Sequence, residues 1–284
     1  MSGQKHALVL FSKAPLPGLT KTRLIKAKGG ILTPEEAAEF YKATMFDVAE
    51  VGFRALIQCS EPVKAEEENE PESYDFFVSC SPESESPYLQ SIFAEAGPWP
   101  ALIHFIIDRG TNFDEHFNDT YRQLFDRGYQ SVVAIGGDIP TMRPDQIQRA
   151  FQWLAYLGAL SDRGGLVIAP CQDCGVSLVG LTRDAAMDFT GVFYNLDGVP
   201  ALDAIVAIAE ARDIPAAMLE PVGDIDYPED LAHAFSMIRA MAYTSQFQPD
   251  VLVPKRTLAW IEQTGLVVVT PPNRKHDPRE HIDG

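Results

Sequence analysis

Residues 7–24 read ALVLFSKAPLPGLTKTRL, and this stretch sets the expectation for the fold. The apolar run 7–11 is typical of a buried strand, and the two prolines and the glycine behind it are typical of a loop. The loop ends in the cations Lys21 and Arg23. A strand followed by such a loop is the arrangement in which open α/β sheets bind ligands, beyond the carboxyl end of the strand.

The basic loop belongs to an acidic protein. The first 34 residues hold six Lys or Arg and no Asp or Glu, whereas the whole chain of 284 residues carries a formal net charge of -17. A cationic segment on an acidic body favours a compact anionic ligand, and the overall acidity argues against a nucleic-acid surface. We predict that Lys13, Lys21 and Arg23 contact phosphate groups together with backbone amides of the loop. The alternative is a solvated loop that balances nearby carboxylates.

The rest of the chain alternates between strand-like and helix-like segments. This pattern predicts a three-layer α/β/α fold, with a mostly parallel sheet covered by helices on both faces. The predicted strands are residues 7–11, 53–59, 74–79, 102–107, 131–135, 166–169 and 176–181. The predicted helices are residues 34–50, 87–95, 112–127, 144–157, 201–212 and 228–241.

We predict that the chain divides into a main domain, residues 1–242, and a C-terminal extension, residues 243–284. The extension is expected to pack against the main domain or against a second subunit, which would give a homodimer. We expect it to contain a short helix at 257–263, a strand at 266–270 and a disordered last dozen residues. The Glu-rich stretch 61–73 is expected to be a solvated loop. No apolar run is long enough to cross a membrane and no secretory pattern begins the chain, so we predict a cytoplasmic protein without membrane contact.

A second polar segment follows the apolar strand at 131–135. Gly136 and Gly137 would let a ligand approach the backbone closely, and Asp138 lies at the strand mouth. An Mg²⁺ ion bound to phosphate needs a hard oxygen ligand at such a place. The alternative for Asp138 is a cap on the turn before the next helix.

A third polar segment contains Asp224, Asp226 and Asp230. Residues two apart on an extended stretch point the same way, so Asp224 and Asp226 could face one cation. The alternative is that these residues cap the following helix, which we expect at least of Asp230. Cys171 and Cys174 form a C-x-x-C, but the spacing suits neither a zinc site nor a thioredoxin-like motif, and we interpret it as coincidence.

In this order, the segments resemble a GT-A-fold family of nucleotide-diphospho-sugar transferases or glycosyltransferases. The family is related to the 2-phospho-lactate and molybdenum-cofactor guanylyltransferases. Its motifs are similar to K-x-P-x-P-G-x-x-K-T-R-L at 13–24, G-x-D-x-P at 136–140, P-x-x-D-G-G at 170–175 and D-I-D-x-P-E-D-L at 224–231. The resemblance covers residues 6–240.

The resemblance implies roles for individual residues. Lys21, Arg23 and Asp138 would be catalytic. The residues that bind the nucleotide would be Lys13, Pro15, Gly18, Lys21, Arg23, Gly136 and Gly137. Asp138 would bind Mg²⁺ or Mn²⁺ with Asp226 and Asp224, and Asp173, Gly175 and His116 would contact the acceptor. Two positions depart from the family pattern, since Cys174 replaces a glycine and His116 replaces an arginine.

We therefore expect an enzyme, a metal-dependent nucleotidyltransferase. It would move a nucleoside monophosphate from a triphosphate to a small phosphorylated or acidic acceptor and release pyrophosphate. The alternatives are a glycosyltransferase that uses a nucleotide-diphosphate sugar, and a nucleotide-binding protein without catalysis. The expected partners are the nucleotide and the small acceptor, and not a nucleic acid.

Overall fold

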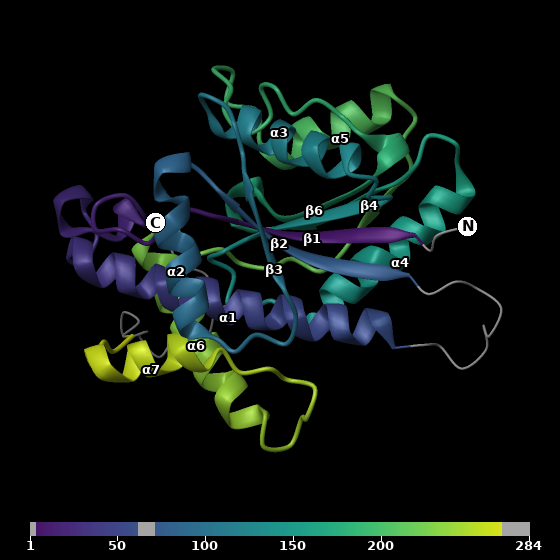
Figure 1. Cartoon of the computed structure of the whole chain (residues 1–284). Helices are drawn as coiled ribbons and strands as arrows, with labels where there is room; N and C mark the ends of the chain where they lie inside the picture. Colours follow the sequence, from purple (N-terminus) through teal and green to yellow (C-terminus); the bar gives the residue numbers. More distant parts are fainter. Residues whose placement is uncertain (1–3, 62–71, 269–284) are drawn as a thin grey trace, which may run out of the picture.

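A computed structural model describes residues 4–61 and 72–268, which form a seven-stranded sheet between layers of helices (Figure 1). The strand order is β3-β2-β1-β4-β6-β5-β7, and β6 alone runs antiparallel to its neighbours in this sheet. The strands are β1 (Lys5–Ser12), β2 (Ser73–Cys80), β3 (Ile103–Ile107), β4 (Ser131–Gly136), β5 (Leu166–Pro170), β6 (Val176–Thr182) and β7 (Ala216–Met218). The predicted α/β fold with a mostly parallel sheet is confirmed.

Helices cover both faces of the sheet, as predicted. Figure 1 shows α3 and α5 on one face and α1, α2 and α4 on the other. The helices are α1 (Pro34–Ser60), α2 (Ser86–Ala96), α3 (Phe113–Asp126), α4 (Pro144–Leu160), α5 (Ala201–Ala211), α6 (Pro228–Thr244) and α7 (Lys255–Thr264). None of the helices in the described part of the chain combines the length and apolarity needed to cross a bilayer.

The alternation of side chains along β1 divides the core in two. Leu8 and Leu10 pack under α1 and α4, whereas Ala7 and Val9 pack under α3 and α5. All four are fully buried. Because both faces of β1 are covered, its sequence is a continuous apolar run and not an alternating one.

One predicted strand, residues 53–59, is wrong because this segment is the last part of α1. Phe53 and Leu56 are buried three residues apart, while Ile57 is exposed, which is the spacing of a helix face. The ring of Phe53 lies 4.5 Å from that of Phe76 on β2. A short apolar run fits either structure, and here the contact with the sheet favours the helix.

Helix α1 begins where predicted. The Thr33 hydroxyl accepts a hydrogen bond from the Glu36 backbone N–H at 3.1 Å, and the Glu36 carboxylate accepts one from the Thr33 N–H at 2.7 Å. This reciprocal pair satisfies two amide groups that the first turn of a helix leaves free. It fixes the direction in which the chain leaves the basic loop.

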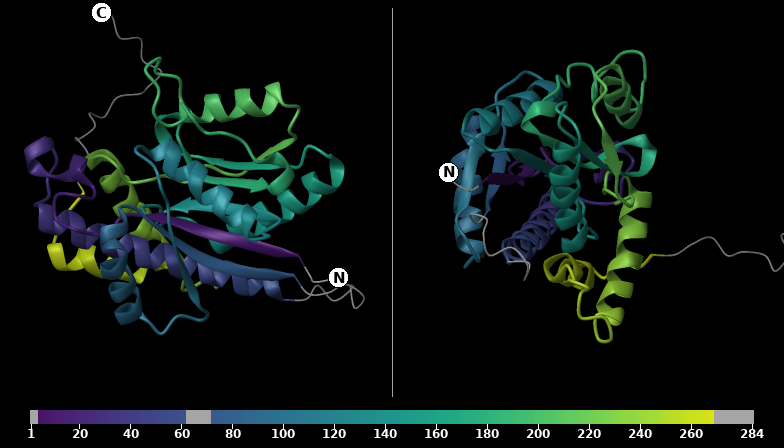
Figure 2. Two further views of the ribbon diagram at one scale, coloured as in Figure 1. Left: turned by 45° about the horizontal axis from the view of Figure 1, so that its top comes forward. Right: turned by 90° about the vertical axis from the view of Figure 1, so that its right-hand side faces the viewer.

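The described part of the C-terminal extension packs on the main domain, one of the two predicted arrangements. Figure 2 shows α7 beside α1. The buried carboxylate of Asp47 on α1 accepts hydrogen bonds from the backbone N–H and the hydroxyl of Thr257, both at 2.7 Å. Trp260 lies 5.0 Å from Phe40 in the same apolar cluster as α6. The predicted domain boundary at residue 242 falls in the last turn of α6.

Two other predictions concern the ends of segments. Residues 266–268 form no strand, contrary to the prediction for 266–270. The rest of that segment, the last dozen residues and most of the loop 61–73 lie outside the described residues. The edge strand β7 was not predicted, because three residues carry too little periodicity to be recognised.

Candidate active site

The basic loop leaves the carboxyl end of β1 and is anchored along its length. Ala14 and Thr20 are buried, and the Lys13 backbone N–H donates to the hydroxyl of Tyr41 on α1 at 3.2 Å. Gly18 has a φ of 79°, a left-handed conformation that favours glycine. Lys13 and Gly18 are exposed on the loop, so both are accessible to a ligand.

Lys21 is the centre of the site. Its ammonium group lies between two carboxylates, donating to Asp138 Oδ2 and, at 2.9 Å, to Asp226 Oδ1. Only 6% of the Lys21 side chain is exposed. Lys21 adopts a left-handed backbone conformation, with φ of 48°, which is uncommon for a residue with a side chain. The structure thus joins residues that are 117 and 205 positions apart in the sequence.

Two glycines stand where β4 ends, Gly136 as its last residue and Gly137 directly after it. A Cβ atom at Gly136 would lie 2.8 Å from Asp138 Oδ1, and one at Gly137 would lie 2.9 Å from the Tyr41 hydroxyl. Either contact would displace a polar group of the site. The glycines therefore make room for Asp138 and Tyr41, and their predicted contact with a nucleotide stays a prediction.

Asp226 is held by the start of α6. Asp230 accepts hydrogen bonds from the Asp226 N–H at 3.0 Å and the Tyr227 N–H at 2.7 Å, which confirms its expected role as a cap. Arg23 donates to Asp226 Oδ2 at 2.6 Å, and its guanidinium lies 5.0 Å from the centre of the Tyr227 ring. Arg23 is 54% exposed, so it is the outer cation of the site.

Asp224 lies beside this centre without contacting Lys21. The Cys171 thiol donates to Asp224 Oδ2 at 3.6 Å, and the Gln172 side-chain amide donates to the backbone oxygen of Asp224. The two carboxylates predicted to face one cation therefore have different partners. We interpret the C-x-x-C spacing as coincidence, but one of its cysteines, Cys171, contacts Asp224 at this site.

The pKa values in the site reflect burial and the neighbouring charges. Burial would lower the pKa of Lys21, but Asp138 and Asp226 outweigh it and raise that pKa above its ordinary value. Burial would raise the pKa of Asp226, but Lys21 and Arg23 hold it below its usual range. Burial, together with the negative charges of Asp138 and Asp226, raises the pKa of Asp224 to about 6. Lys21 therefore stays charged as long as the two carboxylates face it.

The turn between β5 and β6 lies on one flank of this centre. Asp173 and Cys174 are exposed and both have a φ of 58°. Left-handed backbone favours glycine, which accounts for the glycine that the family motif has in place of Cys174. A Cβ atom at Gly175 would lie 2.7 Å from the Cys171 sulfur, so this glycine is needed for the tight turn.

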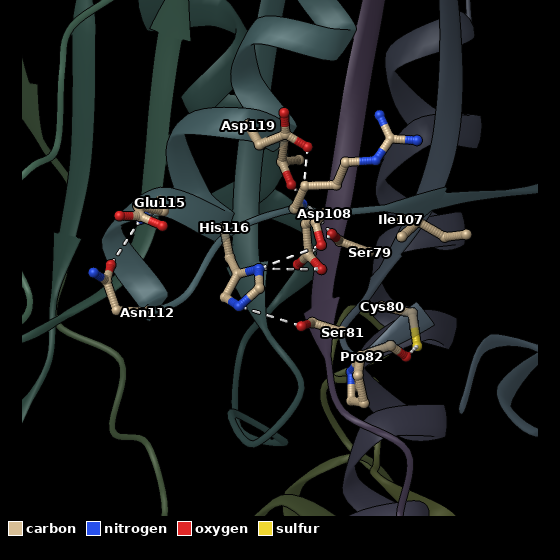
Figure 3. Close-up of polar contacts among 12 residues, drawn as sticks. Ser79, Cys80, Ser81, Pro82, Ile107, Asp108, Asn112, Glu115, His116 and Asp119 are labelled. Atoms are coloured by element: carbon tan, nitrogen blue, oxygen red, sulfur yellow. Dashed lines mark hydrogen bonds and ion pairs between the residues drawn. The ribbon is translucent and has the colours of Figure 1, made fainter. Parts of the chain in front are cut away.

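His116 lies on the other flank, at the carboxyl ends of β2 and β3 (Figure 3). Its Nδ1 lies 3.3 Å from the backbone oxygen of Asp108, which can only accept, so Nδ1 carries a proton. Nε2 lies 3.3 Å from the Ser81 hydroxyl. Asp108 Oδ1 lies 3.8 Å from Nδ1. Serine, imidazole and carboxyl thus follow one another in a line.

Asp108 is buried with one oxygen satisfied. Its Oδ2 accepts from the Ser79 hydroxyl at 2.9 Å, whereas Oδ1 has no hydrogen-bond partner among the described residues. Burial raises the pKa of Asp108 above its ordinary value, against the opposing effects of Ser79 and His116. This carboxyl follows an apolar strand just as Asp138 does, so the same sequence signal could have identified it, although Asp108 was not predicted. Tyr41, which is also part of the site, had no such signal because it lies inside a helix.

The predicted acceptor residues do not form one small pocket. Ser81, which contacts His116, directly follows β2, and the turn with Asp173 leads into β6. In the strand order β2-β1-β4-β6 these two places are three strand spacings apart, roughly 14 Å. Lys21 and Asp138 lie between them. The contact of Asp173, Gly175 and His116 with the acceptor stays a prediction.

Asp138 and Asp226 supply too few ligands for a divalent cation by themselves, so such a cation would need further ligands from a bound substrate. Across residues 4–61 and 72–268, no three or more His, Cys, Asp or Glu side chains are arranged to hold a metal ion. The oxygens of Asp138 and Asp226 already meet at one cation, the ammonium of Lys21. Mg²⁺ is commonly bound by one or two carboxylates together with substrate phosphates, and this donor set suits that mode.

Comparisons with known proteins support the fold. A family model described as an uncharacterized protein conserved in bacteria (DUF2064) matches residues 69–196, less than half of the chain. No curated protein matches the sequence. The crystal structure of a putative nucleotide-diphospho-sugar transferase from Desulfovibrio desulfuricans G20 superposes with a TM-score of 0.66 at 21% identity, covering 93% of this chain and 96% of that one.

Two further structures are more distant. A 4-diphosphocytidyl-2C-methyl-D-erythritol synthase from Anaerococcus prevotii DSM 20548 has a TM-score of 0.48 at 11% identity, covering 84% of this chain and 96% of its own. A cytidylyltransferase from Leptospira borgpetersenii has a TM-score of 0.46 at 11% identity, covering 96% and 99%. The superposition on the Desulfovibrio protein, along almost the full length of both chains, carries the conclusion: this chain has the nucleotide-diphospho-sugar transferase-like fold that its motifs predicted.

Proposed function

We propose that the protein is a nucleotidyltransferase that joins a nucleoside monophosphate to a small phosphorylated or acidic acceptor. The observation that carries this proposal is the convergence of Lys21 and Arg23 with Asp138 and Asp226 at the carboxyl ends of β1 and β4. Cations placed at this edge of an open sheet suit a phosphate chain. The similar structure from Desulfovibrio desulfuricans G20 is named as a putative nucleotide-diphospho-sugar transferase, which agrees with a nucleotide site in this fold.

In the proposed reaction an oxygen of the acceptor attacks the α-phosphorus of a nucleoside triphosphate. A bond forms between that oxygen and the α-phosphorus, and the bond to the bridging oxygen of the β-phosphate breaks, so pyrophosphate leaves with its electron pair. Lys21 and Arg23 stabilise the negative charge that gathers on the phosphates. Asp138 and Asp226 would hold a divalent cation, which neutralises phosphate charge when bound.

Glycosyl transfer is the second candidate, and the His116 flank favours it. A sugar or alcohol acceptor must lose a proton, and His116, which lies 3.3 Å from the Ser81 hydroxyl, is a candidate base for that proton. A phosphate or carboxylate acceptor needs no such base. The two reactions differ in their products, because glycosyl transfer releases a nucleoside diphosphate and nucleotidyl transfer releases pyrophosphate.

The first experiment is thermal unfolding with each nucleoside triphosphate and with nucleotide-diphosphate sugars, with and without Mg²⁺ or Mn²⁺. A ligand at 100 times its Kd adds about 2.7 kcal/mol to the free energy of unfolding. Pyrophosphate and nucleoside diphosphate are then measured with acceptor mixtures and the ligand that stabilises the protein. Lys21→Met should lose the stabilisation, and Lys28→Met, at an exposed lysine of the same basic segment, should keep it.

A shift with one triphosphate and release of pyrophosphate would support nucleotidyl transfer. A shift with a nucleotide sugar alone would favour glycosyl transfer. A shift without turnover would favour a binding protein, and no shift with any nucleotide would contradict the proposal.

A further inference from the structure

Lys21 occupies the place that a divalent cation would need. Its ammonium is buried and lies within hydrogen-bond distance of both Asp138 Oδ2 and Asp226 Oδ1. These are the two carboxylates whose oxygens converge, since Asp224 faces the Cys171 thiol. A metal ion bound by both aspartates would have to displace the ammonium.

We infer that Lys21 and a divalent cation compete for one site, so that the metal enters only together with the nucleotide. This inference rests on the proposed function, because the phosphate chain is the group that receives Lys21 when it leaves the aspartates. In the nucleotide-free protein Lys21 acts as a tethered cation that keeps the carboxylates in place.

The charges of the centre support this exchange. Asp138 and Asp226 face two positive side chains, Lys21 and Arg23, so each of these two carboxylates has a cationic partner without a metal. A divalent cation that entered alone between the two aspartates would lie close to the Lys21 ammonium. The two positive charges would repel each other strongly, because this place is poorly solvated. A nucleotide that carries the metal also brings a polyphosphate chain. Its negative charge is larger in magnitude than the positive charge of the metal, so the chain can still pair with Lys21 and Arg23.

The backbone of Lys21 is held while its side chain can move. The Lys21 carbonyl accepts from the Leu24 N–H at 2.9 Å, and the neighbouring Thr20 and Leu24 are buried. The flexible four-carbon stem of lysine lets the ammonium change partners without a change in the loop. The exchange therefore needs a rotation of one side chain only.

The test is Mn²⁺ binding to the nucleotide-free protein, measured by calorimetry and by the electron paramagnetic resonance signal of free Mn²⁺. Lys21→Met should bind Mn²⁺ at least about tenfold more tightly than the wild type, because the competing charge is gone. Lys28→Met is the matched control and should bind as the wild type does. Adding Asp138→Asn to Lys21→Met should remove the gain, which places the metal at the aspartates.

Equal Mn²⁺ affinity in Lys21→Met and the wild type would overturn the inference, as would tight Mn²⁺ binding by the nucleotide-free wild type. Circular dichroism checks that Lys21→Met is folded. If it is not, the ammonium signals of ¹⁵N-lysine-labelled wild-type protein decide: the buried Lys21 signal should persist with Mg²⁺ alone and shift with Mg²⁺ and nucleotide. A Lys21 signal displaced by Mg²⁺ alone would contradict the competition.

Nucleotide binding, measured separately by thermal unfolding, tells the two failures apart. If no nucleotide stabilises the wild type, the proposed function fails. If nucleotide binds and Lys21→Met shows no gain in Mn²⁺ affinity, only the competition fails.

Discussion

The centre at β1 and β4 and the flank at β2 and β3 both bury charge at the same edge of the sheet, but they differ in how the charge is compensated. In the centre, the Lys21 ammonium has two carboxylate partners. In the flank, Asp108 Oδ1 lies 3.8 Å from the imidazole of His116 and has no hydrogen-bond partner within residues 4–61 and 72–268. Buried charges are stable only when they are paired and hydrogen-bonded. The charges of the nucleotide-free centre are therefore compensated, whereas the flank holds a carboxyl at a cost in stability.

The largest effect is expected from Asp138→Asn, which tests whether the centre is catalytic as well as structural. The amide is close in shape to the carboxylate but lacks its charge, so it would hold a cation poorly. A bound metal contributes several kcal/mol to the stabilisation of a transition state. We therefore expect the overall rate of product formation to fall at least about hundredfold. The measurement is pyrophosphate or nucleoside diphosphate release at saturating nucleotide. A rate within about threefold of the wild type would mean that the centre only holds the fold.

Lys21→Met is expected to have the next largest effect, this time on the stability of the nucleotide-free protein. It leaves Asp138 and Asp226 facing each other without the cation between them. Breaking a fully buried pair costs about 3–5 kcal/mol, and solvent access to both aspartates reduces our expectation to about 2–3 kcal/mol. The measurement is urea unfolding, with Lys28→Met as the control. If the free energy of unfolding falls by less than about 0.5 kcal/mol, Lys21 does not compensate the charges of Asp138 and Asp226, and the centre does not differ from the flank in this respect.

Much of the fold and part of the centre could be predicted from the sequence. Continuous apolar runs such as 7–11 and 131–135 predicted buried parallel strands, and the capping box at Thr33 predicted the start of α1. The run 53–59 was misassigned because helix and strand both fit a short apolar segment. The order of the basic loop, Asp138 and Asp226 predicted that these residues belong to one site.

The contacts within the site could not be predicted. Which carboxylate Lys21 binds depends on its left-handed backbone and on where α6 starts relative to β4, and neither follows from local pattern. The same holds for Tyr41, which reaches the site from a helix interior. Asp108 had a local signal, its place after an apolar strand, but its missing partner is a property of the packed flank.

A third prediction concerns the outer cation of the centre. Arg23→Ala should weaken nucleotide binding by about 1.5 kcal/mol, at the lower end of the range for a charge-assisted hydrogen bond because Arg23 is largely exposed. Stability without nucleotide should change little, since exposed ion pairs contribute at most about 1 kcal/mol. Calorimetric titration with the nucleotide measures the affinity. Arg23→Lys is the matched variant, and it should recover only part of the loss because lysine lacks the planar fork.

The smallest effect is expected from Asp108→Asn in the flank, and this variant should raise the stability of the protein where Lys21→Met lowers it. Burial raises the pKa of Asp108 in the folded protein above its unfolded value of 3.8, so the ionised carboxyl lowers stability. This penalty is absent below the unfolded pKa and grows as the pH rises through the folded pKa. Asp108→Asn removes the charge, and Ser79 can still donate to the amide oxygen. The variant should be more stable than the wild type near pH 7.5, and the difference should shrink near pH 4.5.

Urea unfolding at the two pH values measures the effect of Asp108→Asn, and Asp47→Asn is the contrasting variant. Burial raises the pKa of Asp47 as well, but this carboxylate accepts hydrogen bonds from Thr257 and Arg256. An amide would turn its NH₂ group toward some of these donors, so Asp47→Asn should lower stability at both pH values. The two buried carboxyls then differ only in their partners. A loss of stability in Asp108→Asn near pH 7.5 would show that the flank is compensated after all, by contacts equivalent to those of the centre.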